Sequence, residues 1–206
     1  MFTLPTALTW ARILLIPLFV GVFFVPAGTL GLHEKNLIAT VVFVVAALTD
    51  WLDGYLARTL NQTSAFGAFL DPVADKLMVA AALIMLVELS RTSTVIALII
   101  IGREITISAL REWMAKVGAS RSVAVSMIGK IKTTAQMIAL LCLLYSVSPN
   151  TPVTDIWMGG PIFHIGDWML AIAAMLTLVS AVQYLRAAWP SLREDEIAAR
   201  SQAKKR

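Results

Sequence analysis

Long apolar runs separated by short charged segments dominate the pattern of this sequence. A helix needs about 20 mostly apolar residues to cross the hydrocarbon layer of a membrane. Three runs are free of charge and of about this length: Ile13–His33, Thr133–Thr154 and Trp168–Leu185. Three shorter runs, 36–49, 77–87 and 92–102, reach spanning length only with the charged residues at one end. We therefore predict an all-α integral membrane fold with six transmembrane helices, over residues 5–26, 36–57, 72–89, 93–114, 125–147 and 164–187.

The composition supports a membrane protein. Apolar residues make up 58% of the 206 residues and charged residues 15%, against about 45–50% and 25% in soluble domains. These values exclude a water-soluble globule, and a single cysteine, Cys142, excludes a disulfide scaffold. We predict a six-helix transmembrane domain over residues 1–190. Residues 191–206 form a charged cytoplasmic tail, either a solvated helix extension or disordered.

Charged residues gather on one side of the membrane when the six spans are threaded up and down. Of the 17 basic residues, only Lys35 and Arg91 fall on the opposite side. Because basic residues are enriched in cytoplasmic segments, we expect the charged side and both termini to be cytoplasmic. The net charge of +4 suits contact with anionic headgroups.

Four aspartates at span ends have no role in orientation, because acidic residues contribute little to it. They are Asp50, Asp53, Asp71 and Asp75. Carboxylates within spans are costly and usually mark an ion or substrate site. In a helix, Gly54 and Ala57 share a face with the first two aspartates. These small residues either leave room for a ligand or pack against a neighbouring helix.

The sequence also predicts that the four carboxylates converge. Asp71 precedes Pro72, which is typical of an N-cap followed by the first residue of a helix. Asp75 then lies one turn later. A loop over residues 59–70 is short enough to bring the two helix ends together.

Four close carboxylates repel one another unless cations lie between them. The adjacent Arg58 supplies only one positive charge. Oxygen ligands without nearby His or Cys favour Mg²⁺ or Mn²⁺ over Zn²⁺. Two such ions can clamp a diphosphate. The residues therefore predict divalent-metal phosphate chemistry at a site that faces the cytoplasm.

Eight of these residues, with their spacing, resemble the signature of the CDP-alcohol phosphatidyltransferases. They are Asp50, Asp53, Gly54, Ala57, Arg58, Gly67, Asp71 and Asp75. The resemblance implies a six-helix membrane fold, usually a homodimer, which transfers a phosphatidyl group from a CDP-linked lipid to an alcohol.

The resemblance also implies roles for individual residues. Asp50, Asp53 and Asp71 would ligate a centre of two Mg²⁺ or Mn²⁺ ions. Asp75 would join this centre and act as general base. The CDP site would be lined by Gly54, Ala57, Arg58, Ser64 and Gly67.

Three further segments are similar to bacterial members of the family, and the similarity covers residues 2–190. They are 4–12, 103–113 and 128–136, with a departure at Thr6, where many relatives carry Asn. This similarity implies transfer from CDP-diacylglycerol to sn-glycerol 3-phosphate, giving phosphatidylglycerophosphate and CMP. It also implies a multi-pass protein of the bacterial inner membrane, without a nucleic-acid partner.

Basic residues at the same membrane face fit an anionic acceptor. They are Arg103, Arg111, Lys130 and Lys132. An alternative is that Arg103–Glu104 and Arg111–Glu112 are structural ion pairs. Other acceptors within the family, inositol phosphate or phosphatidylglycerol, stay open.

Two other classes of protein fit less well. A cation-coupled transporter typically carries its acids near mid-membrane in two related halves, and this sequence has neither feature. A membrane prenyltransferase resembles this chain in its use of aspartates and Mg²⁺. Its two acidic motifs, however, lie far apart, whereas 21 positions separate Asp50 from Asp71.

Overall fold

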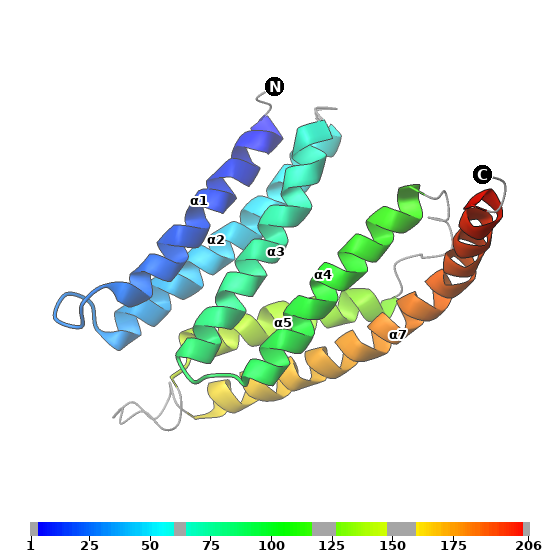
Figure 1. Ribbon diagram of the computed structural model, residues 1–206. Coiled ribbons are helices and arrows are strands. Elements are labelled where there is room, and N and C mark those ends of the chain that lie inside the picture. Colours follow the sequence, from blue (N-terminus) through cyan, green and yellow to red (C-terminus); the bar gives the residue numbers. More distant parts are fainter. Residues whose placement is uncertain (1–3, 60–64, 117–126, 148–159, 204–206) are drawn as a thin grey trace.

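The computed structural model is all-helical over the residues it describes, which are 4–59, 65–116, 127–147 and 160–203. Figure 1 shows long helices running back and forth along one bundle, and the predicted six-helix fold is confirmed. The helices are α1 (Leu4–Phe24), α2 (Leu32–Thr59), α3 (Ala65–Glu88), α4 (Thr94–Lys116), α5 (Met127–Tyr145) and α7 (Pro161–Ala203).

The bundle consists of two three-helix halves. Helix α1 packs against α2 and α3, while α7 packs against α5 and α4. The halves meet where α2 contacts α5 and where α3 contacts α4. In Figure 1 the N-terminal end of α1, the start of α3 and the end of α7 point to the same end of the bundle. This end also carries the predicted aspartates, so the arrangement agrees with the threading inferred from the sequence.

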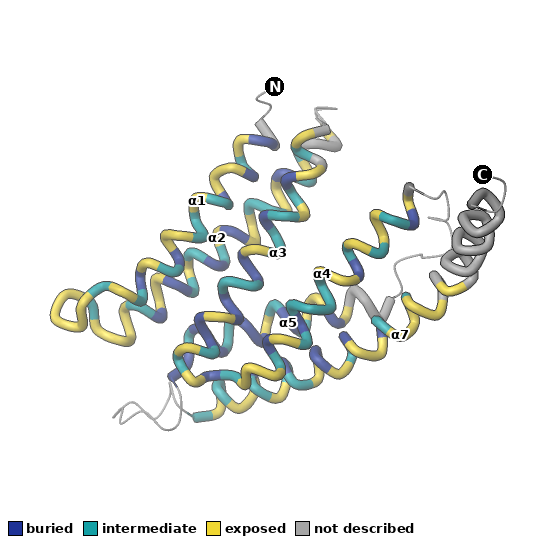
Figure 2. The backbone as a smooth tube through the Cα atoms, in the orientation of Figure 1, coloured by how far each residue is buried: buried dark blue, intermediate teal, exposed yellow. Residues whose placement is uncertain are grey.

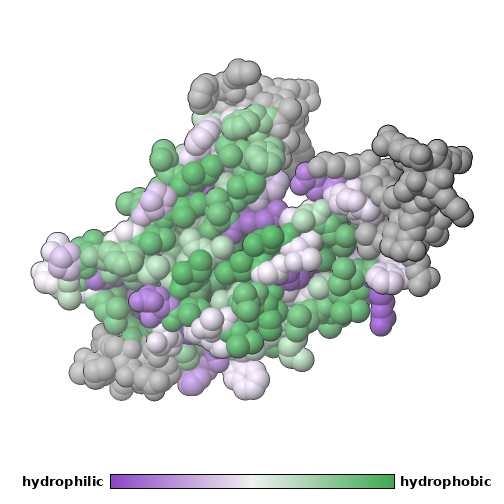
Figure 3. All heavy atoms as spheres, viewed as in Figure 1, coloured by the Kyte–Doolittle hydropathy of each residue, from purple (hydrophilic) through white to green (hydrophobic). Residues whose placement is uncertain are grey.

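The outer surface of the bundle is suited to lipid. Three helical segments are long and apolar enough to span a membrane: Thr6–Phe24, Leu32–Leu56 and Pro161–Arg186. Exposed positions follow the outer sides of the helices (Figure 2), and many are large apolar residues. Hydrophobic residues cover most of the face seen in Figure 3, with hydrophilic residues in the gap between α3 and α4. The chain is therefore a membrane protein.

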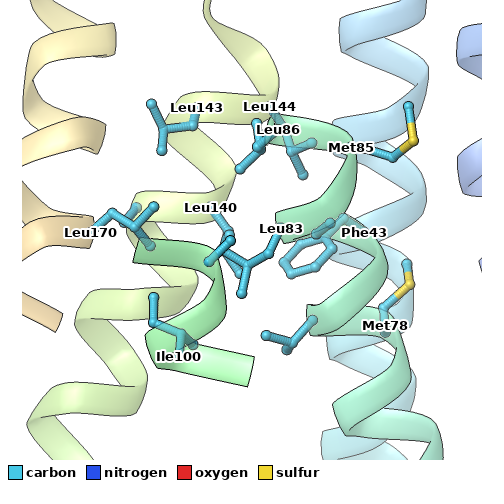
Figure 4. Close-up of a cluster of buried hydrophobic side chains, with 14 of the residues drawn as sticks. Phe43, Met78, Leu83, Met85, Leu86, Ile100, Leu140, Leu143, Leu144 and Leu170 are labelled. Atoms are coloured by element: carbon cyan, nitrogen blue, oxygen red, sulfur yellow. The ribbon is translucent and has the colours of Figure 1, made fainter. Parts of the chain in front are cut away.

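The apolar core lies between α3, α4 and α5, with contributions from α2 and α7 (Figure 4). Leu83, Ile100 and Leu140 are fully buried there. Small buried residues such as Ala39 and Ala82 allow the helices to approach closely, which is how membrane helices usually pack. This core fixes α3 and α4 relative to α2 on the side of the aspartates.

The predicted start of the third helix is wrong. Helix α3 begins at Ala65, so Asp71 is not an N-cap and Pro72 lies inside the helix. A proline inside a helix removes one backbone hydrogen bond and crowds the carbonyl four residues earlier, yet α3 continues through the exposed Pro72. Because α2 continues to Thr59, the connection is also much shorter than the predicted loop over 59–70. Asp71 and Asp75 still lie one turn apart.

A buried polar cluster closes the opposite end of the bundle. The Arg91 guanidinium donates to the carbonyls of Leu143 and Leu144 at 3.1 and 2.8 Å, and to Asn36 Oδ1 at 2.7 Å. Asn36 in turn donates to the carbonyl of Ser146 at 3.2 Å. These bonds satisfy carbonyls at the end of α5, which have no partner within the helix. Arg91 thus ties the two halves together, on the side where the sequence placed it.

Helix α7 continues through residue 190 to Ala203 without a break. Its last part belongs to the charged tail predicted from the sequence. Of the two forms expected for this tail, a helix extension or a disordered segment, residues 191–203 adopt the helix. The division of the chain at residue 190 stays a prediction, because no change in the backbone marks it.

Candidate active site

The acidic cluster consists of Asp50 and Asp53 on α2 and Asp71 on α3. One carboxylate oxygen from each lies within 4.8 Å of the others. The side chain of Asp53 is 3% exposed, whereas those of Asp50 and Asp71 are 42% and 41% exposed. The cluster therefore has one buried carboxylate at its base and two at its opening.

Arg12 of α1 lies at the centre of this cluster, which the sequence did not predict. Its Nη1 donates to Asp50 Oδ1 at 2.6 Å and to Asp71 Oδ1 at 3.2 Å. Its Nη2 donates to Asp53 Oδ2, and the Arg12 side chain is 1% exposed. The sequence offered Arg58 as the only nearby positive charge, whereas the structure supplies Arg12 from a different helix. An arginine within an apolar helix is the signal that could have identified it, because such residues face a bundle interior or a partner.

The cluster also fits a divalent cation. Three carboxylates against one guanidinium leave a formal charge of −2, and all the donors are oxygens, which Mg²⁺ and Mn²⁺ prefer. Asp53 Oδ1 is buried and accepts no hydrogen bond from the described residues. A buried carboxylate oxygen without a donor is costly, and a metal ion would remove this cost. The acidic cluster could thus bind a metal.

Asp75 lies beside the cluster rather than within it. It is not part of the group whose oxygens lie within 4.8 Å of one another. It is close enough to interact electrostatically with Asp50, Arg12 and Glu104. Together with Arg12 it also borders a small space between α1, α2, α3 and α5. The structure therefore brings three of the four aspartates into one set and leaves the fourth on its flank.

Gly54 keeps open space next to the aspartates. A Cβ atom built on this glycine would meet no atom within 4 Å outside its own helix backbone. Of the two interpretations left open by the sequence, close helix packing does not apply to Gly54 in the described part of the chain. The open space beside Asp50 and Asp53 remains available to a ligand.

The remaining residues of the predicted CDP site are less defined. Gly67 lies in the first turn of α3. Ala57 and Arg58 belong to the last turns of α2, but their side chains lie outside the described residues, as does Ser64 altogether. Their contacts with CDP stay predictions.

The basic residues of the other half surround Glu104. Lys132 is 2% exposed and pairs with Glu104 Oε1 at 2.6 Å. Arg103 donates to the same oxygen at 3.1 Å and to Ser180 Oγ at 2.9 Å, and its guanidinium lies over the ring of Tyr184. The structural ion pair considered for Arg103–Glu104 is therefore present, and the Lys132–Glu104 pair was not predicted.

Arg111 differs from these two residues because its side chain is exposed. It lies on α4 about two turns beyond Arg103, toward the end of the bundle that carries the aspartates. The side chain of Lys130, in the first turn of α5, lies outside the described residues. Among the four predicted acceptor residues, Arg111 is thus the described one with an exposed side chain.

Comparison with known proteins decides the family. Residues 2–183 match the model of the CDP-alcohol phosphatidyltransferase family. The chain belongs to this family. The resemblance seen in the sequence is therefore confirmed, and the aspartates described above are those of a CDP-alcohol phosphatidyltransferase.

Individual relatives are similar over nearly their whole length. Proteins of Shigella flexneri serotype 5b (strain 8401) and Escherichia coli (strain K12) are each 50% identical over 189 residues. A protein of Salmonella typhimurium (strain LT2) is 49% identical over the same length. Each alignment covers 91% of this chain and 95% of the relative. All three relatives carry the name CDP-diacylglycerol–glycerol-3-phosphate 3-phosphatidyltransferase.

Proposed function

We propose that this CDP-alcohol phosphatidyltransferase transfers the phosphatidyl group of CDP-diacylglycerol to sn-glycerol 3-phosphate, giving phosphatidylglycerophosphate and CMP. The observation that carries the chemistry is the cluster of Asp50, Asp53 and Asp71 at one end of a membrane bundle. The acceptor follows from the relatives, whose name states it and whose similarity covers 91% of the chain. No other class of function has comparable support.

The cluster would hold two Mg²⁺ or Mn²⁺ ions through Asp50, Asp53 and Asp71, with Asp75 completing the ligand set. When bound, such ions neutralise charge on the transferring phosphoryl group and on the departing CMP. The open space beside Gly54 is where the nucleotide diphosphate would reach the carboxylates. Ala57, Arg58, Ser64 and Gly67 would complete the CDP site.

Asp75 would act as the general base. An acceptor hydroxyl attacks the phosphorus atom that bears the diacylglycerol, its proton passes to the Asp75 carboxylate, and the bond to the CMP oxygen breaks. The position of Asp75 on the flank of the cluster supports this role, because a general base must lie within hydrogen-bond reach of the acceptor hydroxyl. The direct displacement needs no covalent enzyme intermediate.

The acceptor phosphate would bind to the basic residues near α4 and α5. Arg111 is free to reach it from the exposed surface, whereas Arg103 and Lys132 are held by Glu104. We place Lys130 beside them from its position in the sequence. Positive charge at this place suits an acceptor that already carries a phosphate.

We further place the protein in the bacterial inner membrane, with the aspartates and both termini in the cytoplasm, as a homodimer. The asymmetry of basic residues supports this orientation. The numerous exposed apolar side chains would face lipid and a second subunit.

The function is tested with the purified protein and a panel of acceptors: sn-glycerol 3-phosphate, inositol phosphate and phosphatidylglycerol. We expect CMP release from CDP-diacylglycerol with glycerol 3-phosphate alone, and loss of this release when EDTA removes divalent ions. Turnover with a different acceptor would change the assignment within the family. Transport of an ion without CMP release would exclude it.

The metal ligands are tested by Asp50→Ala and Asp71→Ala. Each substitution removes a carboxylate at the opening of the cluster, so we expect turnover to fall at least a thousandfold while the protein stays folded in detergent. Asp167→Ala is the matched control, because Asp167 lies near the start of α7 at the opposite end of the bundle. Metal-dependent CMP release retained in either cluster variant would contradict the assignment.

Arg111→Ala tests the acceptor site. We expect the KM for glycerol 3-phosphate to rise at least tenfold while the KM for the CDP-lipid changes little, since a charge-assisted bond to phosphate is worth about 1.5–3 kcal/mol. The control is Arg186→Ala, because Arg186 is also an exposed arginine but lies on α7. Equal rises in both KM values would contradict an acceptor role for Arg111.

A further inference from the structure

The exposed side chains of α2 change in character along the helix toward the aspartates. At helical spacing on one face they are, in order, Val41, Val45, Leu48, Trp51, Tyr55 and Thr59. The first three are aliphatic, the next two are aromatic with a polar tip, and the last carries a hydroxyl. Aromatic rings with a polar tip are enriched where the hydrocarbon layer meets the headgroups. This face of α2 thus follows the passage from hydrocarbon through that boundary to water.

Three other helices, from both halves of the bundle, show the same change from aliphatic to aromatic. Toward the aspartate end, their exposed residues are Leu18, Leu14 and Trp10 on α1; Ile84, Leu77, Phe69 and Phe66 on α3; and Leu178, Val182, Leu185 and Trp189 on α7. The aromatic residues at this end form what we call the aromatic collar: Trp10, Trp51, Tyr55, Phe66, Phe69 and Trp189. Their exposed fractions lie between 41% and 66%, so the rings are available to the surroundings of the bundle.

The aromatic collar lies at the level of the acidic cluster. Trp51 directly follows Asp50 in α2, and Phe69 lies two residues before Asp71 in α3. Because an α-helix rises about 1.5 Å per residue, each of these rings is attached within about 3 Å of its aspartate along the helix axis. The height of the collar in a membrane therefore sets the height of the carboxylates.

Stacking holds four of the exposed rings against the bundle. The rings of Trp51 and Tyr55 are 5.9 Å apart, with 12° between their planes. Trp10 of α1 stacks on Phe66 of α3 at 6.5 Å and 27°. Stacked rings restrict each other and form a broad flat surface. Such a surface is suited to rest against a layer rather than to enter it as single flexible chains.

The distribution of the collar favours the bilayer over a second subunit as its partner. A twofold interface buries a single self-complementary patch on each subunit. The collar instead includes α1, α2 and α3 from one half of the bundle and α7 from the other. On each of these helices it borders exposed aliphatic residues, which require hydrocarbon next to them.

From this arrangement we infer that the aromatic collar binds the boundary between headgroups and acyl chains, in the leaflet on the side of the aspartates. It thereby holds the acidic cluster level with the lipid phosphates. A lipid-linked diphosphate then meets the carboxylates without its lipid leaving the leaflet. The inference goes beyond the proposed function and rests on it only in taking such a lipid as substrate.

The depth of the collar is measured by tryptophan fluorescence in phosphatidylcholine vesicles. The vesicles contain a nitroxide lipid labelled at the headgroup, near the start of an acyl chain or near its end. The difference between wild type and Trp51→Phe isolates the signal of Trp51. We expect quenching near the chain end to be at least threefold weaker than quenching at the two shallow positions. Leu48→Trp in the Trp51→Phe background is the matched control, because it moves the indole about 4.5 Å deeper along α2 and should shift quenching toward the chain end.

The consequence for the reaction is tested by Trp51→Leu combined with Tyr55→Leu, which keeps both side chains apolar but removes their polar tips. In vesicles we expect the KM for the CDP-lipid to rise at least threefold, while the KM for glycerol 3-phosphate stays unchanged. In detergent micelles neither KM should change, since a micelle adapts its surface to the protein. Leu18→Ala, an exposed change deeper on α1, should leave every value unchanged. Trp10→Leu with Phe66→Leu replaces the first variant if that variant does not fold.

Several results would overturn the inference. Strongest quenching of Trp51 at the chain end would place the collar in hydrocarbon, and quenching by aqueous iodide alone would place it in water. Absence of quenching by any nitroxide lipid would indicate that another protein chain covers the collar. An unchanged lipid KM in vesicles, or an equal rise in vesicles and micelles, would show that the collar does not act through the bilayer. Because fluorescence needs no turnover, a wrong acceptor assignment would leave the quenching result intact.

Discussion

At the scale of single residues, the site is a balance between three carboxylates and one guanidinium. Arg12 reaches all three aspartates from α1 and is almost completely buried. A buried arginine without such partners would be strongly unfavourable, so Arg12 and the aspartates depend on each other in the metal-free protein. The positive charge of Arg12 would also repel a divalent ion that enters the cluster.

We predict that Arg12→Ala strengthens the response to Mg²⁺. A repulsion of about 1.4 kcal/mol between the guanidinium and a bound cation would change the apparent Kd tenfold. The variant should melt at a lower temperature than wild type in EDTA and show a larger rise in Tm when Mg²⁺ is added, measured by thermal unfolding in detergent. Arg12→Lys keeps the charge and should respond like wild type. Equal rises in Tm for all three proteins would show that Arg12 does not compete with the metal.

The sequence predicted the carboxylates of the site better than its positive charges. The spacing of Asp50, Asp53 and Asp71 around two helix ends was enough to bring them together. In the sequence, Arg12 is one of the basic residues on the charged side of the membrane, and nothing local to α1 indicates that its partners lie 38 or more positions away. The Lys132–Glu104 pair joins two helices in the same way and was missed for the same reason.

At the scale of helices, the long apolar periodic segments were predictable and their ends were not. Pro72 was taken as a helix start, since proline favours that position, yet α3 begins seven residues earlier. The residues before it, 65–71, form the first two turns, and the proline costs one hydrogen bond. Local preference at one residue was outweighed by the packing of the whole helix.

The helices α5 and α7 pack closely against each other, and the sequence did not predict this contact. Gly166 of α7 is buried, and a Cβ added there would lie 2.9 Å from Leu143 Cγ and 3.0 Å from Cys142 Cβ. The Cβ atom of Cys142 is fixed to the backbone of α5, so rotation of that side chain cannot remove the contact. The glycine therefore sets the distance between the two helices.

We predict that Gly166→Ala destabilises the protein by about 1–3 kcal/mol, the usual cost of overpacking. In detergent this should appear as a Tm lower by several degrees. Gly21→Ala in α1 is the control, because its added Cβ would meet no atom within 4 Å, and it should be neutral or stabilising by up to about 1 kcal/mol. An equal effect of both substitutions would indicate that close packing at Gly166 contributes nothing.

At the scale of the whole molecule, two three-helix halves meet along α2–α5 and α3–α4. The acidic cluster belongs to the first half, and Glu104 with its basic partners belongs to the second. A site that uses both groups would lie between the halves, at the end opposite the Arg91–Asn36 cluster. That cluster joins the two halves at the end far from the aspartates.

We predict the orientation of the molecule from its basic residues and expect cysteine labelling to confirm it. In a Cys142→Ser background, Gly28→Cys lies between α1 and α2 and Thr59→Cys at the exposed end of α2. A membrane-impermeant maleimide should modify Gly28→Cys in intact cells and Thr59→Cys only after the membrane is opened. The reverse pattern would place the aspartates outside the cytoplasm.

The arginine of α1 also bears on how the protein is made. Arg12 enters the bilayer with the first helix, before α2 brings its acidic residues. A counter-charge is thus already present when Asp53 must leave water, which lowers the energetic cost of insertion. A divalent ion would then not be needed for the bundle to assemble, and its binding to the aspartates would follow folding.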